Sequence, residues 1–376
     1  MQLSQQDSLR INVLLRQPLN AIRIDDGKMI VYGLTDKGEA KIELNPNCKD
    51  EVYVKRVKEM ISSHVLGSPG GYPVFLKRWT RMGQARADSL ENLLKLGEPE
   101  AVVAVVGAEG ITNEIARRAW WVMPNSENAR RMLANDDVVK GDMGKILAEF
   151  LLEFLPFEEE PRNIIESVRL VLQPGLVSDD ICSELWKKGQ RKNAFLVGFL
   201  KTRQHTIPEQ ADEHKLLPQW KAQLSALADN NNKYAQLLLD MLLPEGQAYF
   251  KTIEAVLKKP ANQDVVVALL EAIELRFISV RPHTEKRRDI DQILVEAKNY
   301  CVECANDKDK KALDEVNALD THLKTMLENL MVLSCVGEQL VAPIFATTDS
   351  VGSVMRRKIE PITKPLTNCL NILMGE

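Results

Sequence analysis

The sequence predicts a mainly α fold. An irregular array of HEAT/TPR-like helix pairs is expected between a small N-terminal three-stranded antiparallel β meander and a C-terminal helical hairpin or bundle. Three observations support this prediction. Glycines and prolines punctuate the central part at intervals of 13 to 18 residues, which is the length of one helix and its turn. Aromatic residues make up only 5% of the 376 residues, which is low for an all-β protein. Apolar residues recur at heptad spacing near the C-terminus.

Residues 1–66 are predicted to form an N-terminal α/β cap. A helical opening over 3–16 is followed by apolar and charged residues that alternate, as in β strands, up to Leu44. Asp26-Gly27 is placed for a two-residue hairpin turn with positive φ, and residues 36–38 can close a second turn. One face of such a sheet must be covered, and we expect the helical stretch 50–66 to cover it.

Residues 67–280 are predicted to form the helical array. The loop Gly67–Pro73 holds three glycines and two prolines in seven residues, so it cannot continue a helix or a strand. Beyond the loop, each interval between chain breakers is expected to hold one helix, and helix pairs would repeat at about 30 residues, a period typical of stacked helical repeats. The breakers are Gly97, Gly110, Pro124, Gly141, Pro156 and Pro174.

Residues 281–376 are predicted to form the C-terminal helical hairpin or bundle. Two heptad seams, over 290–304 and 316–333, are separated by the polar turn 306–309, which favours two antiparallel helices. Each seam is shorter than three heptads, so packing within the chain is favoured over dimerisation. A last helix over about 351–373 is expected as a third member.

Composition and charge exclude several classes of protein. With 49 basic and 53 acidic residues, the net charge of −4 excludes a polycation but leaves local basic surfaces open, because 67–87 and 186–208 contain no acid. The polar start is unlike a signal peptide, and the apolar stretch 330–348 contains Glu338 and Pro343, so we expect no membrane association. Six scattered cysteines fit reduced thiols, which favours a cytoplasmic location.

No catalytic, metal-binding or cofactor-binding motif emerges, and we expect none of these sites. The sharpest local motif is Cys301-Val-Glu-Cys304. Both cysteines continue an apolar seam in the last turn of a helix, where the negative end of the helix dipole should raise a thiol pKa. Core thiols are therefore favoured, while a redox pair and a metal site with two further ligands remain as alternatives.

Basic clusters next to tryptophans are the candidate partner-binding residues. Adjacent Trp120 and Trp121 point about 100° apart on a helix, so at least one is expected in the core. Basic side chains beside aromatic rings suit an acidic protein or a nucleic acid, but solvated helix faces are the favoured explanation, followed by an acidic protein and then by RNA or DNA. Further basic residues lie at Arg130, Arg131, Lys201, Arg203 and from Arg276 to Arg288. The candidates are Lys77, Arg78, Trp79, Arg81, Arg86, Arg117, Arg118, Lys187, Lys188, Arg191 and Lys192.

Several strings within about residues 20–200 resemble the DsrS family. They are Ala21-Ile-Arg-Ile-Asp25, Val65-Leu-Gly-Ser-Pro-Gly-Gly-Tyr-Pro73, Leu76-Lys-Arg-Trp-Thr-Arg-Met-Gly83, Ala116-Arg-Arg-Ala-Trp-Trp121, Asn128-Ala-Arg-Arg-Met-Leu133 and Ser167-Val-Arg-Leu-Val-Leu-Gln-Pro-Gly175. Members are soluble cytoplasmic accessory proteins encoded beside the reverse-type dissimilatory sulfite reductase of sulfur-oxidising bacteria. The resemblance implies an accessory or regulatory role in sulfur oxidation, and it transfers no catalytic residue.

From these observations we expect a non-enzymatic accessory protein of dissimilatory sulfur oxidation. It is expected to act through a protein partner of the sulfur-oxidation machinery or through an RNA, and its oligomeric state stays open. Two rival functions remain. One is an RNA-binding post-transcriptional regulator, whose affinity would fall steeply with salt. The other is a thiol-dependent sulfur-transfer or redox protein that uses Cys301 and Cys304, which would need an accessible thiol of low pKa.

Overall fold

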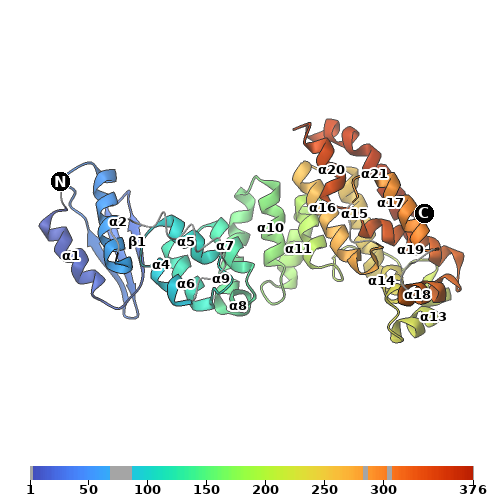
Figure 1. The fold of residues 1–376 in the computed structure, drawn as a ribbon, viewed down its shortest axis with the longest axis horizontal. Coiled ribbons are helices and arrows are strands. Elements are labelled where there is room, and N and C mark those ends of the chain that lie inside the picture. Colours follow the sequence, from blue (N-terminus) through green and yellow to red (C-terminus); the bar gives the residue numbers. More distant parts are fainter. Residues whose placement is uncertain (1–2, 68–86, 283–286, 303–306, 376) are drawn as a thin grey trace. The chain divides into compact units, whose positions relative to one another are not determined.

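The computed structural model confirms a mainly α fold with an N-terminal three-stranded antiparallel sheet (Figure 1). It describes residues 3–67, 87–282, 287–302 and 307–375. Contacts divide the chain into two compact units, Met1–Pro156 and Phe157–Glu376, here called unit 1 and unit 2. The three-part division at residues 66 and 280 stays a prediction.

The sheet of unit 1 is a meander with strand order β1-β2-β3. Its strands are β1 (Leu19–Asp25), β2 (Ile30–Thr35) and β3 (Gly38–Glu43). The first turn corrects the prediction, because four residues join β1 to β2 and Met29, not Gly27, has the positive φ of 53°. The Asp25 carboxylate accepts a hydrogen bond from the backbone N–H of Lys28 at 3.0 Å, and this side-chain bond closes a wider turn.

Two helices enclose the core of the sheet, α1 (Gln5–Leu15) and α2 (Asp50–Leu66). Val57 and Ile61 of α2 are fully buried in one cluster with Ile22 and Val31, as predicted for a helix that covers the sheet. Gly33 permits the close approach of α1. A Cβ at this position would lie 2.8 Å from the Leu14 side chain, so a larger residue would force the helix away.

The remaining helices of unit 1 lie between the predicted breakers, with one exception. The interval Pro124–Gly141 was predicted to hold one helix and holds two, because the Asn135 side chain caps a new helix start. Consecutive helices contact each other, and α6 also contacts β1. The helices are α4 (Ala87–Leu93), α5 (Pro99–Val106), α6 (Asn113–Val122), α7 (Ser126–Leu133), α8 (Asp136–Lys140) and α9 (Asp142–Phe154). The 3-10 turn η1 (Leu155–Phe157) follows α9.

Unit 2 is built around α16 (Gln263–Phe277), which contacts α10, α12, α15, α19 and α20. These long-range contacts set unit 2 apart from a linear stack of helix pairs. The helices before α16 are α10 (Pro161–Val171), α11 (Asp179–Gly189), α12 (Ala194–Thr202), α13 (Leu217–Asp229), α14 (Lys233–Leu242) and α15 (Pro244–Lys258). The 3-10 turn η2 (Ile278–Val280) follows α16.

The two predicted seams fall mainly on α17 and α19, but the predicted polar turn 306–309 is wrong from residue 307 on, because an extra helix, α18, begins there. The seam over 316–333 was predicted as one helix, but α18 ends at Asn317 and the Asp320 side chain caps a new helix by accepting from the His322 N–H. α19 contacts both α17 and α21, so α21 is the predicted third member. The helices are α17 (Ile290–Tyr300), α18 (Asp307–Asn317), α19 (Thr321–Ser334), α20 (Glu338–Phe345) and α21 (Gly352–Met374).

Among the described residues, no single helix has the length and apolar character needed to cross a bilayer. The pair α19 and α20, bent by 52° at the break between them, meets those two criteria when taken together.

Candidate functional site

The candidate site is the set of basic residues singled out from the sequence. Five of them, Lys77, Arg78, Trp79, Arg81 and Arg86, lie outside the described residues. The other candidates lie on α6 in unit 1 and, in unit 2, in the last turn of α11 and just after its end.

Arg117 and Arg118 lie on α6, and a capping side chain defines where this helix begins. The Thr112 hydroxyl caps the helix by accepting a hydrogen bond from the Ile115 N–H at 3.3 Å. Glu114 lies in the first turn, where its negative charge interacts favourably with the positive end of the helix dipole. It also lies one turn before both arginines.

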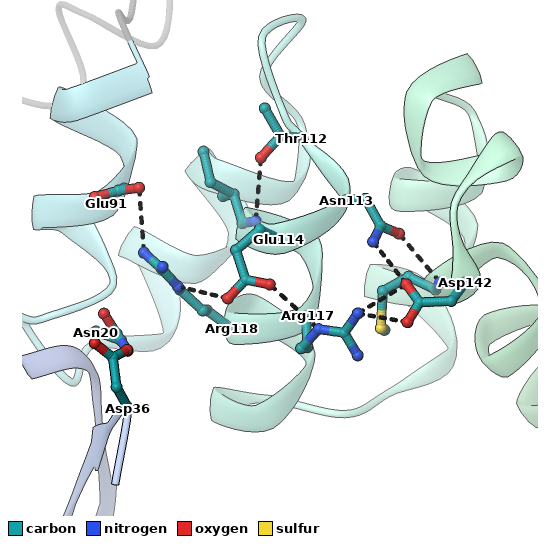
Figure 2. A network of polar contacts seen from close by, with 11 residues as sticks. Asn20, Asp36, Glu91, Thr112, Asn113, Glu114, Arg117, Arg118 and Asp142 are labelled. Atoms are coloured by element: carbon teal, nitrogen blue, oxygen red, sulfur yellow. Dashed lines mark hydrogen bonds and ion pairs between the residues drawn. The ribbon is translucent and has the colours of Figure 1, made fainter. Parts of the chain in front are cut away.

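Both arginines of α6 are held in ion pairs within unit 1 (Figure 2). The Arg117 guanidinium donates to both carboxylate oxygens of Asp142, at 2.8 and 2.5 Å, and lies 3.3 Å from Glu114. Arg118 lies 3.1 Å from Glu91 of α4 and 3.1 Å from Glu114. The network therefore joins α4, α6 and the start of α9.

The Arg117–Asp142 pair also changes the acidity of the carboxylate. Hydrogen bonds from Arg117 and from the Asn113 amide lower the pKa of Asp142 to about 2. The charges of Arg117 and Arg118 are thus largely used to hold unit 1 together. Partner contact through Arg117 and Arg118 stays a prediction, and both arginines are paired with carboxylates.

The two tryptophans of α6 correct the expectation that at least one is in the core. Both are half-buried. Trp120 packs edge-to-face on Phe150 with ring centroids 4.8 Å apart, while the Trp121 indole N–H donates to Glu39 at 3.0 Å. The two rings thus contact different neighbours, and α6 itself contacts both β1 and α9.

The cationic end of α11 comprises Lys187, Lys188, Arg191 and Lys192. Ser178 caps the start of α11 by accepting from the Ile181 N–H, and Asp179 and Asp180 occupy its first turn. Negative charges at the start of a helix and positive charges at its end both interact favourably with the helix dipole. This explains why the acidic and basic residues of α11 lie at opposite ends.

All four side chains of this cationic end are exposed. Lys192 donates to the backbone oxygen of Glu158 at 3.3 Å. Within the described part of the chain, Lys187, Lys188 and Arg191 form no ion pair. Trp186, in contrast, is only 8% exposed and packs edge-to-face on Phe199 at 5.1 Å. The Trp186 ring is therefore part of the core, whereas the lysine side chains are at the surface.

Most of the other basic residues of unit 2 that were singled out from the sequence have partners inside the unit. Lys201 pairs with Glu271 at 3.0 Å, and Arg203 donates to the Leu172 oxygen at 3.2 Å. The later cluster behaves likewise, since Arg281 pairs with Glu274 at 2.9 Å and Arg287 with Glu296 at 3.0 Å. Arg276 lies 2.8 Å from a ring nitrogen of His205. These residues stabilise the fold and leave the end of α11 as the free cationic surface among them.

Cys301 is 4% exposed at the end of α17, and its thiol lies 3.5 Å from the Met331 sulfur. Cys304 lies outside the described residues. Across the described ranges, no group of three or more His, Cys, Asp or Glu residues is placed to hold a metal ion. The redox alternative for Cys301 and Cys304 stays a prediction.

Sequence reasoning missed a second free cationic surface on α21. Arg357 and Lys364 lie on this helix together with Pro361 and Pro365. The signal was present, because two prolines four residues apart inside an apolar helical pattern mark an unusual helix face. The basic residues of this helix do not form an acid-free stretch, because Glu360 lies between Arg357 and Lys364.

Comparison of the chain with protein-family models, with curated proteins and with solved structures finds no match.

Proposed function

We propose that this chain is a non-enzymatic accessory protein of dissimilatory sulfur oxidation. It acts by binding an acidic surface of a protein of the sulfur-oxidation machinery through the cationic end of α11. The resemblance of its sequence strings to the DsrS family supports the biological setting. The exposed, unpaired cations of α11 support the mode of binding.

The single observation that carries the proposal is the contrast between α6 and α11. Arg117 and Arg118 are neutralised by carboxylates at 2.5 to 3.3 Å. Lys187, Lys188 and Arg191 are exposed and form no such pair among the described residues. A group of unpaired cations attracts an acidic surface over about 8 Å at physiological salt. Cations at the rim of a protein interface also keep most of their hydration when the partner binds.

A protein partner is favoured over RNA by the position of Trp186. Proteins that bind single-stranded RNA combine cations with exposed aromatic rings on which bases stack. The Trp186 ring is packed against Phe199 and is only 8% exposed, so it offers no stacking face. The cationic end of α11 therefore has the charge that an acidic protein needs and lacks the ring that an RNA site would add.

The test is affinity purification from native lysate of a sulfur-oxidising bacterium, using the full chain as bait. The charge-reversal variant Lys187→Glu/Lys188→Glu should lose most of the recovered partner, because opposite charges become like charges. Treatment with ribonuclease should leave recovery by the wild-type chain unchanged.

The matched control is Lys310→Glu/Lys311→Glu, an adjacent exposed lysine pair on α18 of the same unit with the same change of charge. This control should recover the partner as well as the wild type does. Equal recovery by all three baits would overturn the role of α11. Loss of recovery after ribonuclease treatment would assign the surface to RNA.

A further inference from the structure

Unit 2 contains an open groove of about 650 Å³ along α21. Leu294 of α17 and Asn329 of α19 line it together with one face of α21. α19 contacts both α17 and α21, so it forms the floor of the groove and the other two helices flank it. These three helices are drawn in orange to red in Figure 1.

Two prolines give the α21 wall an unusual chemistry. Pro361 and Pro365 lie inside the helix and both line the groove. Proline has no N–H, so the carbonyl groups four residues earlier, those of Arg357 and Pro361, lose their usual intrahelical donor. The face therefore presents apolar rings and backbone acceptors together, where an ordinary helix would present only side chains.

The groove also carries a net positive charge. Arg357 and Lys364 line it, and neither has an ion-pair partner among the described residues. Glu360 is the one acid in its lining. The two cations are seven residues apart, which places them about 10 Å apart along the helix axis on the same face.

The groove exposes an apolar side chain on its α21 side, because Ile372, which lines it, is 41% exposed. The floor, in contrast, is well packed, because Asn329 is 9% exposed and donates to the Thr325 oxygen of its own helix at 2.7 Å. A ligand in this groove would thus meet a firm floor, the apolar side chains of Leu294 and Ile372, and two cations along α21.

We propose that this groove binds an amphipathic helix of a protein partner. The apolar face of that helix covers Leu294, the proline rings and Ile372, and two carboxylates about seven residues apart pair with Arg357 and Lys364. A helix laid over α19 between α17 and α21 completes a four-helix arrangement, which is a stable way to bury such a surface.

Charge complementarity decides against a second copy of this chain as the occupant. A symmetric contact through this face would bring Arg357 and Lys364 of one chain towards the same residues of the other, and like charges repel. The carboxylates of an acidic helix would instead be attracted by Arg357 and Lys364. The proposal uses residues other than the cationic end of α11, so it goes beyond the function proposed above.

The test uses the full chain and synthetic amphipathic peptides of about 18 residues, long enough for several helical turns. The probe peptide has a leucine face bordered by glutamates at positions seven apart. A second peptide replaces those glutamates with lysines. Fluorescence anisotropy should show saturable binding of the glutamate peptide, and the lysine peptide should bind at least about tenfold more weakly.

Protein variants then locate the contact. Arg357→Glu/Lys364→Glu should weaken binding of the glutamate peptide at least about tenfold and restore binding of the lysine peptide. The matched control is Arg356→Glu/Lys358→Glu, which makes the same change of charge on the same helix at residues that do not line the groove. The control should bind as the wild type does, and circular dichroism checks that both variants are folded.

Equal binding of the two peptides, or equal effects of the two variants, would overturn the proposal. The peptide assay contains no cellular partner, so its failure leaves the affinity purification through α11 intact. Loss of peptide binding in Lys187→Glu/Lys188→Glu, with the groove variant unaffected, would move the helix-binding surface to α11 and overturn the assignment of the groove.

Discussion

Arg23 of β1 and Trp121 of α6 lie against each other in unit 1. The Arg23 guanidinium carbon lies 4.8 Å from the centroid of the Trp121 ring, and one of its nitrogens donates to the Trp121 backbone oxygen at 3.4 Å. The same guanidinium lies 4.6 Å from the Tyr32 ring. Arg23 and Trp121 belong to two of the strings that resemble the DsrS family, and they join the sheet to the helices of this unit.

A double-mutant cycle should detect this contact. Arg23→Met and Trp121→Leu each remove the cation–π interaction, so the double variant should lose less stability than the sum of the two single variants. We expect a coupling free energy of about 0.5–1 kcal/mol between Arg23 and Trp121. Denaturant unfolding followed by circular dichroism measures it, and strictly additive losses would show that the two side chains act independently.

Asp142 should titrate at an unusually low pH. Hydrogen bonds from Arg117 and Asn113 lower its pKa to about 2 in the folded chain, against an ordinary value of about 4 in the unfolded chain. Its contribution to stability is therefore present above about pH 4 and disappears as the pH falls towards about 2.

Carboxyl-carbon NMR of Asp142 checks this prediction. The titration midpoint should lie near pH 2, and in the Arg117→Met variant it should move towards about 4. An ordinary midpoint in the wild-type chain would refute the network shown in Figure 2.

Tyr53→Phe should destabilise unit 1 more than the loss of one exposed hydroxyl would. Asp7 is fully buried, and its carboxylate accepts from the Tyr53 hydroxyl at 2.5 Å and from the Asn45 N–H at 2.8 Å. Removing the hydroxyl leaves a buried carboxylate with one donor fewer, which should cost about 1–3 kcal/mol of unfolding free energy.

The pH dependence of this variant follows from the same contacts. Burial raises the pKa of Asp7, but the hydrogen bonds from Tyr53 and Asn45 outweigh it, so the net shift is downward. Its stabilisation is lost as the pH falls through the lowered pKa, and Tyr53→Phe should move acid unfolding to higher pH. Tyr32→Phe is the control, because the Tyr32 hydroxyl has no hydrogen bond among the described residues. Equal acid unfolding of both variants would contradict the prediction.

Native thiol alkylation at about pH 8 should spare Cys301 and Cys369. Cys301 is 4% exposed, and burial raises the pKa of Cys369 to about 12, so its thiolate is scarce at that pH. Burial also raises the pKa of Cys335. Mass spectrometry after a short exposure to iodoacetamide should find Cys48, which is half-buried, modified before Cys301 and Cys369. Rapid modification of Cys301 would instead revive the thiol-dependent rival.

Periodicity predicted the elements of this fold well and their breaks less well. The alternation before Leu44 and the apolar stripe of 50–66 depend on local spacing, and both produced the expected sheet and its covering helix. The break at Asp320 depends on one side chain that caps a helix start inside an apolar seam. Periodicity does not register such a cap, because the seam continues across it.

The candidate site could be predicted only in part, because contacts between helices decide which basic residues are paired. The sequence shows which residues are basic, but it does not show whether a carboxylate from another helix reaches them. Asp142 is 25 residues from Arg117 and neutralises it, whereas no acid in the described ranges reaches Lys187. Pairing across helices therefore decides which cations are free, and only the folded chain reveals it.

The most direct test of the central claim is photo-crosslinking from the cationic end of α11 in living sulfur-oxidising cells. A benzophenone side chain at Gln190, which is exposed between Lys188 and Arg191, should crosslink to a protein of the sulfur-oxidation machinery. The adduct should disappear when Lys187→Glu/Lys188→Glu is added, and a benzophenone at Lys311 should not form it. An adduct that survives the charge reversal, or an adduct with RNA alone, would contradict the proposed function.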